Sequence, residues 1–375
     1  MNVLQILPDL NAGGVERTTV EMVEALRAAG HGAHVLSHGG RLASEIERLG
    51  GVNHIADIGS KNILSVPWRI AGVRRLIAEH KIDVVHARSR APAWPAMFAA
   101  KAERVSFLTT YHGIYNAKSA PKRLYNSVMA RGDHIIANSD FTKAHILKTH
   151  NVSASKITTI YRGVDMTAFD PAKVNAADIA QKRLSWGVGP NQTIVLLPGR
   201  VTRWKGQGVA IAALADLPDD HVLILLGDAQ GRDSLVAELT QQAETLGLTS
   251  RVVFAGHDSD VVTAYASADI VICPSIEPEA FGRTAAEAQA MGKPVIASAI
   301  GGALETVLDG QTGWLVPPNA PEALASAIRR SDDLSSVGAK ARARIADNFS
   351  KTALQSATLA VYEKLHLGTF PRDKA

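Results

Sequence analysis

The sequence predicts two Rossmann-like α/β domains, each built on a parallel sheet. Short apolar runs typical of buried strands alternate with helical patterns along most of the 375 residues. Alternation of this kind is typical of parallel strands joined by right-handed helical crossovers. Eleven such runs are too many for one doubly wound sheet, and a polar, proline-containing stretch at 165–191 separates six of them from the other five. With 46% hydrophobic and 20% charged residues, the chain can form two domains of ordinary size.

The predicted elements follow one another in a regular order. We expect strands in the first domain at 3–8, 33–37, 84–87, 107–110, 135–138 and 157–161, and in the second at 194–198, 222–227, 252–255, 270–274 and 295–297. The last helical pattern has no strand after it and could pack back across the first domain. We therefore place the first domain at 1–170, the second at 171–350 and a C-terminal helix at 351–367.

Two glutamates eight positions apart mark the most informative segment of the chain. Glu279 and Glu287 flank a Phe-Gly pair, with a strand-like run before them and Gly292 after. In a single helix, positions eight apart lie about 12 Å along the axis, so the two carboxylates cannot hold one atom. They would hold opposite ends of a long ligand. We expect a loop up to Phe281 and a helix over 282–291.

The start of that helix is a predicted anion site. The backbone N–H groups of Phe281, Gly282 and Arg283 would point at an anion, because a helix N-terminus carries about half a positive charge. An anion in the middle and hydroxyls at both ends are the features of a nucleotide-sugar. We therefore expect a nucleotide-sugar donor to bind here.

At this segment the chain resembles the retaining glycosyltransferases of family 4. That family has a Glu-x7-Glu motif and the GT-B fold, in which two Rossmann-like domains face each other across a cleft. The resemblance implies that Glu279 contacts the donor sugar and Glu287 the nucleotide ribose. It also implies a C-terminal helix that crosses back to the first domain. For the reaction, it implies same-face attack in which the departing phosphate takes the acceptor proton.

Further motifs follow the predicted strands, where open α/β sheets bind ligands. Arg200 and Lys205 lie five positions apart after a strand, so that both cations could meet a leaving diphosphate. The resemblance implies the same role for both. It also implies that His112 hydrogen-bonds the donor hexose. The Gly13-Gly14 pair is either a tight turn or a loop whose backbone can approach a diphosphate or a sugar. The resemblance implies that this loop lies against the donor phosphates or the acceptor.

Other residues shape the same region or exclude alternatives. Gly227 and Phe254 are expected to contact the base or pyrophosphate through the backbone. Asp258 and Asp260 imitate an Asp-x-Asp metal motif, but they precede a helical run, where aspartates serve as caps and first-turn charges. We therefore predict no metal site and no cofactor, the nucleoside diphosphate sugar being a substrate. Asn11, where starch and glycogen synthases carry Lys, argues against a glucan synthase.

Charge is unevenly divided along the chain. Residues 1–170 hold 21 Lys and Arg against 14 Asp and Glu, whereas the remainder holds 19 against 22. Basic, amphipathic segments at 66–77 and 118–131 either touch an anionic membrane surface or are core-facing helices with a solvated basic face. We see no nucleic-acid-binding motif. The sequence shows no leader and no long apolar run, so we expect a protein in the cytoplasm or at the inner face of the cytoplasmic membrane.

The sequence as a whole favours an enzyme. We expect it to be a hexosyltransferase that transfers from a nucleoside diphosphate sugar to a hydroxyl of a glycan or glycolipid acceptor, in lipopolysaccharide or other cell-surface polysaccharide synthesis. A nucleotide-sugar epimerase of the same architecture and a non-catalytic nucleotide-sugar-binding module remain the alternatives. The sequence argues against a conventional nicotinamide dehydrogenase, because the dinucleotide-binding glycine pattern is missing.

Overall fold

The computed structural model describes residues 1–11, 13–115, 119–330 and 334–370. Residue 118 of the basic segment at 118–131 and residues 371–375 therefore lie outside the described residues. The chain divides into two compact units, one formed by 1–162 with 351–375 and the other by 163–350. The sequence analysis placed the first boundary at 170. Within the described part of the chain, no helix combines the length and the hydrophobicity needed to span a bilayer.

The first unit is built on a seven-stranded parallel sheet in the order β3-β2-β1-β4-β5-β6-β7. Its strands are β1 (Asn2–Ile6), β2 (Gly32–Ser37), β3 (Val52–Ile55), β4 (Val84–Ala87), β5 (Ser106–Tyr111), β6 (His134–Ala137) and β7 (Ile157–Thr159). Its helices are α1 (Gly14–Ala28), α2 (Ala43–Arg48), α3 (Val66–Glu79), α4 (Arg90–Glu103), α5 (Ala120–Ser127), α6 (Asp140–Thr149) and α15 (Lys351–His366), with 3₁₀ turns η1 (Ile63–Ser65), η2 (Val128–Ala130) and η3 (Ala154–Lys156).

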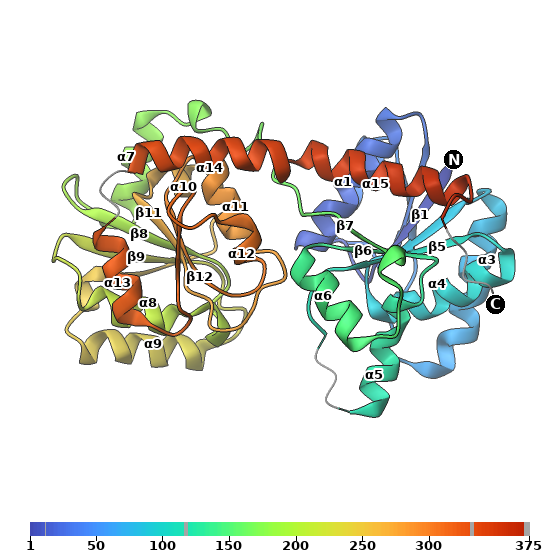
Figure 1. Cartoon of the computed structure of the whole chain (residues 1–375), viewed down its shortest axis with the longest axis horizontal. Helices are drawn as coiled ribbons and strands as arrows, with labels where there is room; N and C mark the ends of the chain where they lie inside the picture. Colours follow the sequence, from blue (N-terminus) through green and yellow to red (C-terminus); the bar gives the residue numbers. More distant parts are fainter. Residues whose placement is uncertain (12, 116–118, 331–333, 371–375) are drawn as a thin grey trace. The chain divides into compact units, whose positions relative to one another are not determined.

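Helices cover both faces of this sheet. Successive β1 side chains point to opposite faces, so each face has apolar side chains to bury. Leu4 packs in a cluster with residues of α3 and α4, whereas Val3 packs with residues of α1 and α15. Figure 1 shows α15, in red, beside α1, in blue, and the two helices are in contact. The last helix thus returns to the first unit, as the sequence predicts.

The second unit is built on a six-stranded parallel sheet in the order β10-β9-β8-β11-β12-β13. Its strands are β8 (Thr193–Pro198), β9 (His221–Leu226), β10 (Val252–Gly256), β11 (Ile270–Cys273), β12 (Val295–Ser298) and β13 (Trp314–Val316). Its helices are α7 (Ala176–Ser185), α8 (Gln207–Leu214), α9 (Asp233–Thr245), α10 (Val261–Ser267), α11 (Arg283–Ala290), α12 (Ala303–Thr306), α13 (Pro321–Arg329) and α14 (Leu334–Asn348), with 3₁₀ turns η4 (Pro171–Lys173), η5 (Arg203–Lys205) and η6 (Thr249–Arg251).

The eleven predicted strands are all present, and two further strands were missed. Both missed strands, β3 and β13, lie at the edge of a sheet. β3 has the sequence Val-Asn-His-Ile with no buried residue, and β13 spans only three residues. Neither gives the apolar run by which a buried strand is recognised. Their absence from the prediction changes the edges of the sheets but not the central strands, whose carboxyl ends carry the candidate site.

Candidate active site

The centre of the candidate site in the second unit is an ion pair between Lys205 and Glu279. The Lys205 Nζ lies 2.9 Å from the Glu279 Oε1, and the two side chains are only 11% and 17% exposed. Ser275 Oγ donates to the same carboxylate oxygen at 2.6 Å. Glu279 Oε2 makes no hydrogen bond to a described residue. The carboxylate is therefore held on one oxygen and leaves the other to accept a ligand hydroxyl.

Helix α11 begins beside Glu279, as the sequence predicts. Gly282 caps the helix in the left-handed conformation, with φ 85°. Within the described residues, the backbone N–H groups of Gly282 and Arg283 make no hydrogen bond, so both can donate to an anion. The Phe281 side chain is buried and stacks edge-on against Phe349. Any contact of Phe281 with a ligand would therefore be made by its backbone.

Glu287 faces the same region from the second turn of α11. Tyr265 OH donates to Glu287 Oε2 at 3.0 Å, and Arg283 lies 3.3 Å from Oε1. Burial together with the Glu287 charge raises the pKa of Tyr265 well above its usual value, so this hydroxyl stays protonated and remains a donor. Cys273, the last residue of β11, is a protonated thiol because burial raises its pKa to about 11. The structure thus adds Tyr265 and Ser275, which the sequence analysis did not select.

Close backbone approaches shape the loops around Lys205. A Cβ at Gly227 would lie 2.0 Å from the carbonyl oxygen of Gly199, and a Cβ at Gly206 would lie 1.9 Å from that of Pro274. Gly206 also has a φ of 77°, which other residues rarely adopt. These glycines let the loops after β8, β9 and β11 meet. Gly227 therefore has a packing role, whether or not it also contacts a ligand.

The two predicted cations have different partners. Arg200 is exposed, and its nearest hydrogen-bond partner is Gln230 Oε1 at 3.5 Å, whereas Lys205 faces Glu279. The main chain of Arg200 is held by Gln207, whose side-chain amide donates to its carbonyl at 3.1 Å. Arg200 thus has a fixed backbone and a side chain that can turn to an anion.

Two further predicted residues lie outside this cluster. The Phe254 side chain packs against the hydrophobic core of the second unit, so only its backbone is left for a ligand. Asp260 caps α10 by accepting from Thr263 N at 3.1 Å, as the sequence predicts, and Asp258 pairs with Lys182 at 2.7 Å. Both aspartates therefore have structural partners in the second unit.

In the first unit, a glycine loop lies between β1 and α1. Gly13 caps α1 with a φ of 144°, and a Cβ there would meet the Glu16 carboxylate at 2.5 Å. Burial raises the pKa of Glu16. The backbone conformation of Gly13 thus favours glycine, and Gly14 is the first residue of α1. The sequence left a tight turn and a ligand loop open here, and this geometry is compatible with both.

His112 follows β5 and presents a defined tautomer. Arg162 Nη2 donates to His112 Nδ1 at 3.0 Å, so the ring proton of the neutral imidazole lies on Nε2. The ring is neutral because burial, and then the charge of Arg162, lower the pKa of His112 well below its usual value. The buried Nε2 has no hydrogen-bond partner within the described residues. His112 is therefore an N–H donor without an acceptor, as a residue that binds a sugar hydroxyl would be.

Arg88 is a second buried donor near His112, and the sequence analysis missed it. Arg88 Nε donates to Gln5 Oε1 at 2.9 Å, while its Nη2 has no hydrogen-bond partner among the described residues. Arg88, His112 and Arg162 line a cavity of about 20 Å³, together with Asn138. Asn138 Nδ2 donates to the His112 carbonyl at 3.4 Å. Arg88 directly follows β4, so its position at the carboxyl edge of the sheet was a usable signal.

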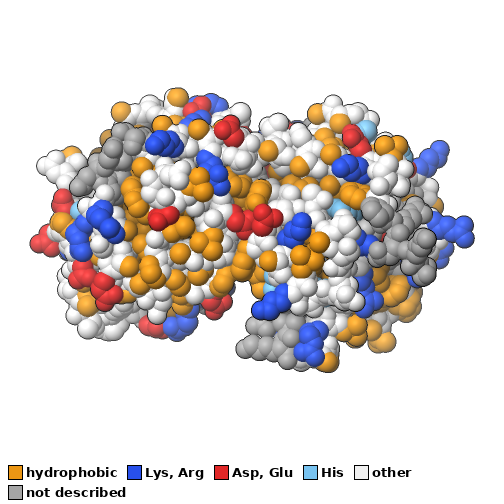
Figure 2. Space-filling model, viewed as in Figure 1, with side chains coloured by type: hydrophobic (Ala, Val, Ile, Leu, Met, Phe, Trp, Pro, Cys, Tyr) orange, Lys and Arg blue, Asp and Glu red, His pale blue; other side chains and the backbone are white. Residues whose placement is uncertain are grey.

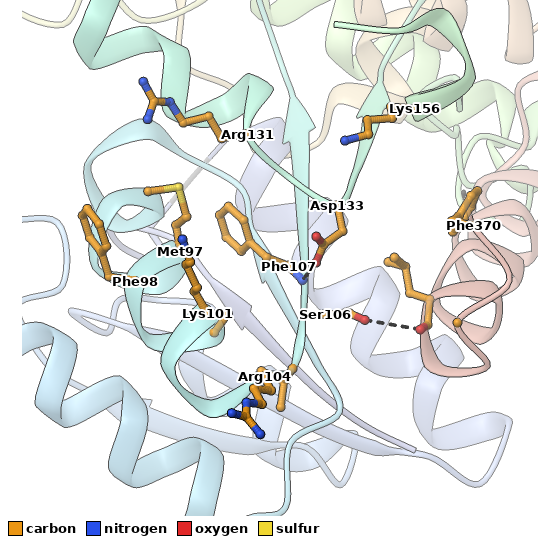
Figure 3. A pocket seen from close by; sticks show the side chains of 14 residues that line it. Met97, Phe98, Lys101, Arg104, Ser106, Phe107, Arg131, Asp133, Lys156 and Phe370 are labelled. Atoms are coloured by element: carbon orange, nitrogen blue, oxygen red, sulfur yellow. Dashed lines mark hydrogen bonds between the residues drawn. The ribbon is translucent and has the colours of Figure 1, made fainter. Parts of the chain in front are cut away.

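A much larger cavity of the first unit, about 700 Å³, lies away from these residues. Figure 3 shows its lining side chains, among them Phe107 and Ser106 at the start of β5 and Asp133 just before β6. Ser106 Oγ donates to the Leu365 carbonyl of α15 at its wall. The cavity thus opens at the amino ends of the strands, opposite the edge that carries His112. Size alone would have misplaced the candidate site.

Comparison with known proteins agrees with the fold. Residues 12–168 match the family described as Glycosyltransferase Family 4, and residues 178–351 match Glycosyl transferases group 1. The crystal structure of a glycosyltransferase from Rickettsia africae ESF-5 matches with a TM-score of 0.90, and the two sequences are 36% identical. The match covers 97% of this chain and 98% of that one. The fold and site therefore define a protein of GT-B architecture. The chain belongs to glycosyltransferase family 4.

Two other relatives carry informative names. The crystal structure of Anabaena Alr3699/HepE in complex with UDP and glucose is 27% identical, with a TM-score of 0.85, and covers 97% of this chain and 99% of that one. A D-inositol 3-phosphate glycosyltransferase of Mycobacterium sp. (strain KMS) is 33% identical over 263 residues, 66% of this chain. The matched region spans 58% of that relative's length.

Proposed function

We propose that the protein is a retaining glycosyltransferase that moves a hexose from a nucleoside diphosphate sugar to a hydroxyl of a glycan or glycolipid acceptor. One observation carries this proposal. The buried Lys205–Glu279 pair lies at the start of α11, whose Gly282 and Arg283 N–H groups are unoccupied within the described residues. A cation, a carboxylate with one free oxygen and a helix N-terminus together match a diphosphate joined to a sugar.

Family membership and a related complex support the choice of donor. The Anabaena relative was crystallised with UDP and glucose and also with UDP-glucose. In this chain, the free Glu279 Oε2 would accept from a hydroxyl of the donor sugar, and Glu287 would accept from the nucleotide ribose. The position of Glu287 in the second turn of α11 agrees with its binding the far end of the same ligand.

The proposed chemistry relies on charge rather than on a metal ion. As the anomeric C–O bond to the diphosphate breaks, the leaving group gains negative charge, which Lys205, Arg200 and the α11 N-terminus would stabilise. The acceptor oxygen bonds to the anomeric carbon on the face that the diphosphate leaves. The acceptor proton passes to the departing phosphate oxygen, so no separate base is required. His112, with its proton on Nε2, would donate to a hydroxyl of the hexose.

The surface of the first unit supports a lipid-linked or membrane-bound acceptor, as in lipopolysaccharide synthesis. In the face shown in Figure 2, Lys and Arg side chains predominate on this unit. Ile63, Leu64 and Trp68, at η1 and the start of α3, are 81%, 79% and 74% exposed. Exposed apolar side chains beside basic ones are typical of surfaces that lie on anionic membranes. Co-sedimentation with anionic vesicles, lost in a Leu64→Ser/Trp68→Ser variant, tests this contact.

The proposed activity is tested by incubating the purified chain in EDTA with a nucleoside diphosphate hexose and a panel of glycan and glycolipid acceptors. We expect release of the nucleoside diphosphate that depends on the acceptor, and a product whose NMR coupling constants show the anomeric configuration of the donor. A product of the opposite configuration would exclude retention. Activity that appears only when a divalent ion is added would exclude the metal-independent mechanism.

The same assay distinguishes the two alternative functions. An epimerase would convert the donor into an isomeric nucleotide-sugar without any acceptor. A binding module would retain the donor and form no product with any acceptor. The buried His112 Nε2, which has no partner among the described residues, supports a ligand site in all three cases, because a buried unpaired donor is costly unless a ligand meets it.

A further inference from the structure

We propose that His34, His54 and His80 form a binding site for a single transition-metal ion, Zn²⁺ or a chemically similar cation, in the first unit and apart from the candidate active site. One ring nitrogen from each of the three side chains lies within 4.8 Å of the other two. The closest pair, His34 Nδ1 and His54 Nε2, is 3.2 Å apart. Two nitrogens bound tetrahedrally to one zinc ion, at about 2.0–2.1 Å each, lie roughly 3.4 Å apart.

The sheet register brings the first two histidines together. In the parallel pair of β2 and β3, His54 is opposite Leu36, and His34 lies two residues before Leu36. His34, Leu36 and His54 therefore point to the same face of the sheet. Leu36 packs with residues of α3 and α4, which identifies this face as the one covered by α3.

The third histidine is placed by the end of α3. His80 is the C-cap of that helix, and its backbone N–H donates to the Leu76 carbonyl. Asn2 on β1 holds the following turn, because its side-chain amide donates to the carbonyls of His80 and Lys81 at 3.0 and 3.1 Å. The His80 ring lies 4.8 Å from each of the other two rings, centroid to centroid. All three histidines thus stand on backbone that other contacts hold in place.

A histidine must be neutral to bind a metal, so the ion and protons compete for these three rings. The nearest carboxylate oxygen, Glu79 Oε1, is 3.9 Å from His80 Nε2. Glu79 could complete the coordination or accept a hydrogen bond from a metal-bound water.

The chemistry of the three ligands selects the kind of ion. Imidazole nitrogens suit Zn²⁺, Ni²⁺, Cu²⁺ and Co²⁺, whereas Mg²⁺ and Ca²⁺ require several oxygen ligands. His34 is buried, but His80 is 27% exposed, so an ion can enter from solvent. The cluster joins the edge strand β3, which has no buried residue, to β2 and to α3. A bound ion would therefore fasten the least buried strand of the sheet to its neighbours.

The experiment uses the untagged full chain, stripped with EDTA and returned to metal-free buffer. Titration with Zn²⁺ by calorimetry, with a chelator as metal buffer, is compared among wild type, His54→Ala, His80→Gln and a control, His366→Gln. We expect one ion per chain and an affinity that falls by at least about 100-fold in the His54 and His80 variants, because loss of a ligand costs more than loss of a group that only supports one. His366→Gln should bind like wild type.

Two further measurements keep the test decisive. Thermal unfolding in EDTA establishes that each variant is folded, and addition of Zn²⁺ should raise the melting temperature of wild type and of His366→Gln only. Co²⁺ bound at the three histidines should give the intense visible bands of a tetrahedral complex. The proposal is overturned if Zn²⁺ fails to bind, if it binds equally to wild type and both cluster variants, or if it binds only weakly at several sites.

Discussion

Lys205 and Glu279, 74 residues apart in the sequence, meet at 2.9 Å where the loops after β8 and β11 come together. Their side chains are 11% and 17% exposed. Arg203, only two residues before Lys205, forms an even shorter pair with Glu238 at 2.6 Å, but that pair is 69% and 54% exposed. The two ion pairs of one loop thus differ in burial, and they provide a matched comparison between a site residue and a surface residue.

Replacing Lys205 should impair transfer, because the leaving diphosphate would lose one of the cations proposed to stabilise it. We expect Lys205→Ala to lower kcat/KM by about 10²–10³-fold, or roughly 2.7–4 kcal/mol of transition-state stabilisation. Arg203→Ala should change it by no more than about twofold, since exposed ion pairs contribute little. Steady-state kinetics with a saturating acceptor measures both. Equal losses in the two variants would remove the proposed role of Lys205.

The Lys205–Glu279 ion pair should also contribute to the stability of the fold. Among the described residues, Lys205→Met leaves the largely buried Glu279 carboxylate with Ser275 as its remaining partner, and we expect a loss of roughly 1–3 kcal/mol in the free energy of unfolding. Glu279→Gln introduced together with Lys205→Met should restore part of that loss, because the buried charge is removed. Urea unfolding of the two single variants and the double variant measures the coupling. Strictly additive effects would show that the pair is not coupled.

Replacing Gly206 should destabilise the protein by more than its left-handed backbone conformation alone would predict. Gly206 and Gly247 have φ angles of 77° and 71°, but a Cβ at Gly206 would lie 1.9 Å from the Pro274 carbonyl, whereas nothing lies within 4 Å of one at Gly247. Gly247→Ala should cost about 1 kcal/mol. Gly206→Ala should cost clearly more and abolish donor binding, because the loops that carry Lys205 and Glu279 must move apart. Thermal unfolding and donor titration would contradict this if the two variants behaved alike.

Acidification should destabilise the first unit, because unfolding exposes a buried neutral histidine to protonation. Burial lowers the pKa of His134 to about 4, against an unfolded value of about 6.5. Between these values the unfolded chain binds more protons than the folded one, so the free energy of unfolding falls as the pH is lowered. We expect the melting temperature in EDTA to drop between pH 6.5 and 5.0, and to drop less in His134→Gln, where the amide can still bond Thr158. An unchanged slope in that variant would contradict the assignment.

Much of the architecture could be predicted because central parallel strands are buried on both faces and appear as apolar runs. β3 and β13 could not, since short edge strands need no such run. The side chains of the site were predicted where a motif follows a strand, as for His112 and Glu279. Arg88 follows β4 just as directly, but a lone arginine carries no motif. Only the structure shows that its Nη2 is buried and lacks a partner among the described residues.

Contacts between distant segments were the least predictable feature. The Lys205–Glu279 pair, the Tyr265–Glu287 hydrogen bond and the His34–His54–His80 cluster each join residues from different elements. Spacing along the chain carries no information on such contacts. Phe281 shows that a motif can also select a residue whose side chain is not at the site. The motif places Phe281 at the start of the helix, but its side chain is buried, and only its backbone is near the site.

The most direct test of the account is donor binding in the presence of EDTA. Thermal-shift and calorimetric titrations of wild type and Lys205→Ala with UDP-, GDP-, ADP- and dTDP-hexoses would show whether a metal-independent nucleotide-sugar site exists and which base it prefers. The account predicts a selective shift for wild type that is lost or greatly weakened in Lys205→Ala, while Arg203→Ala retains it. No shift with any donor in folded wild type, or equal shifts in all three proteins, would contradict it.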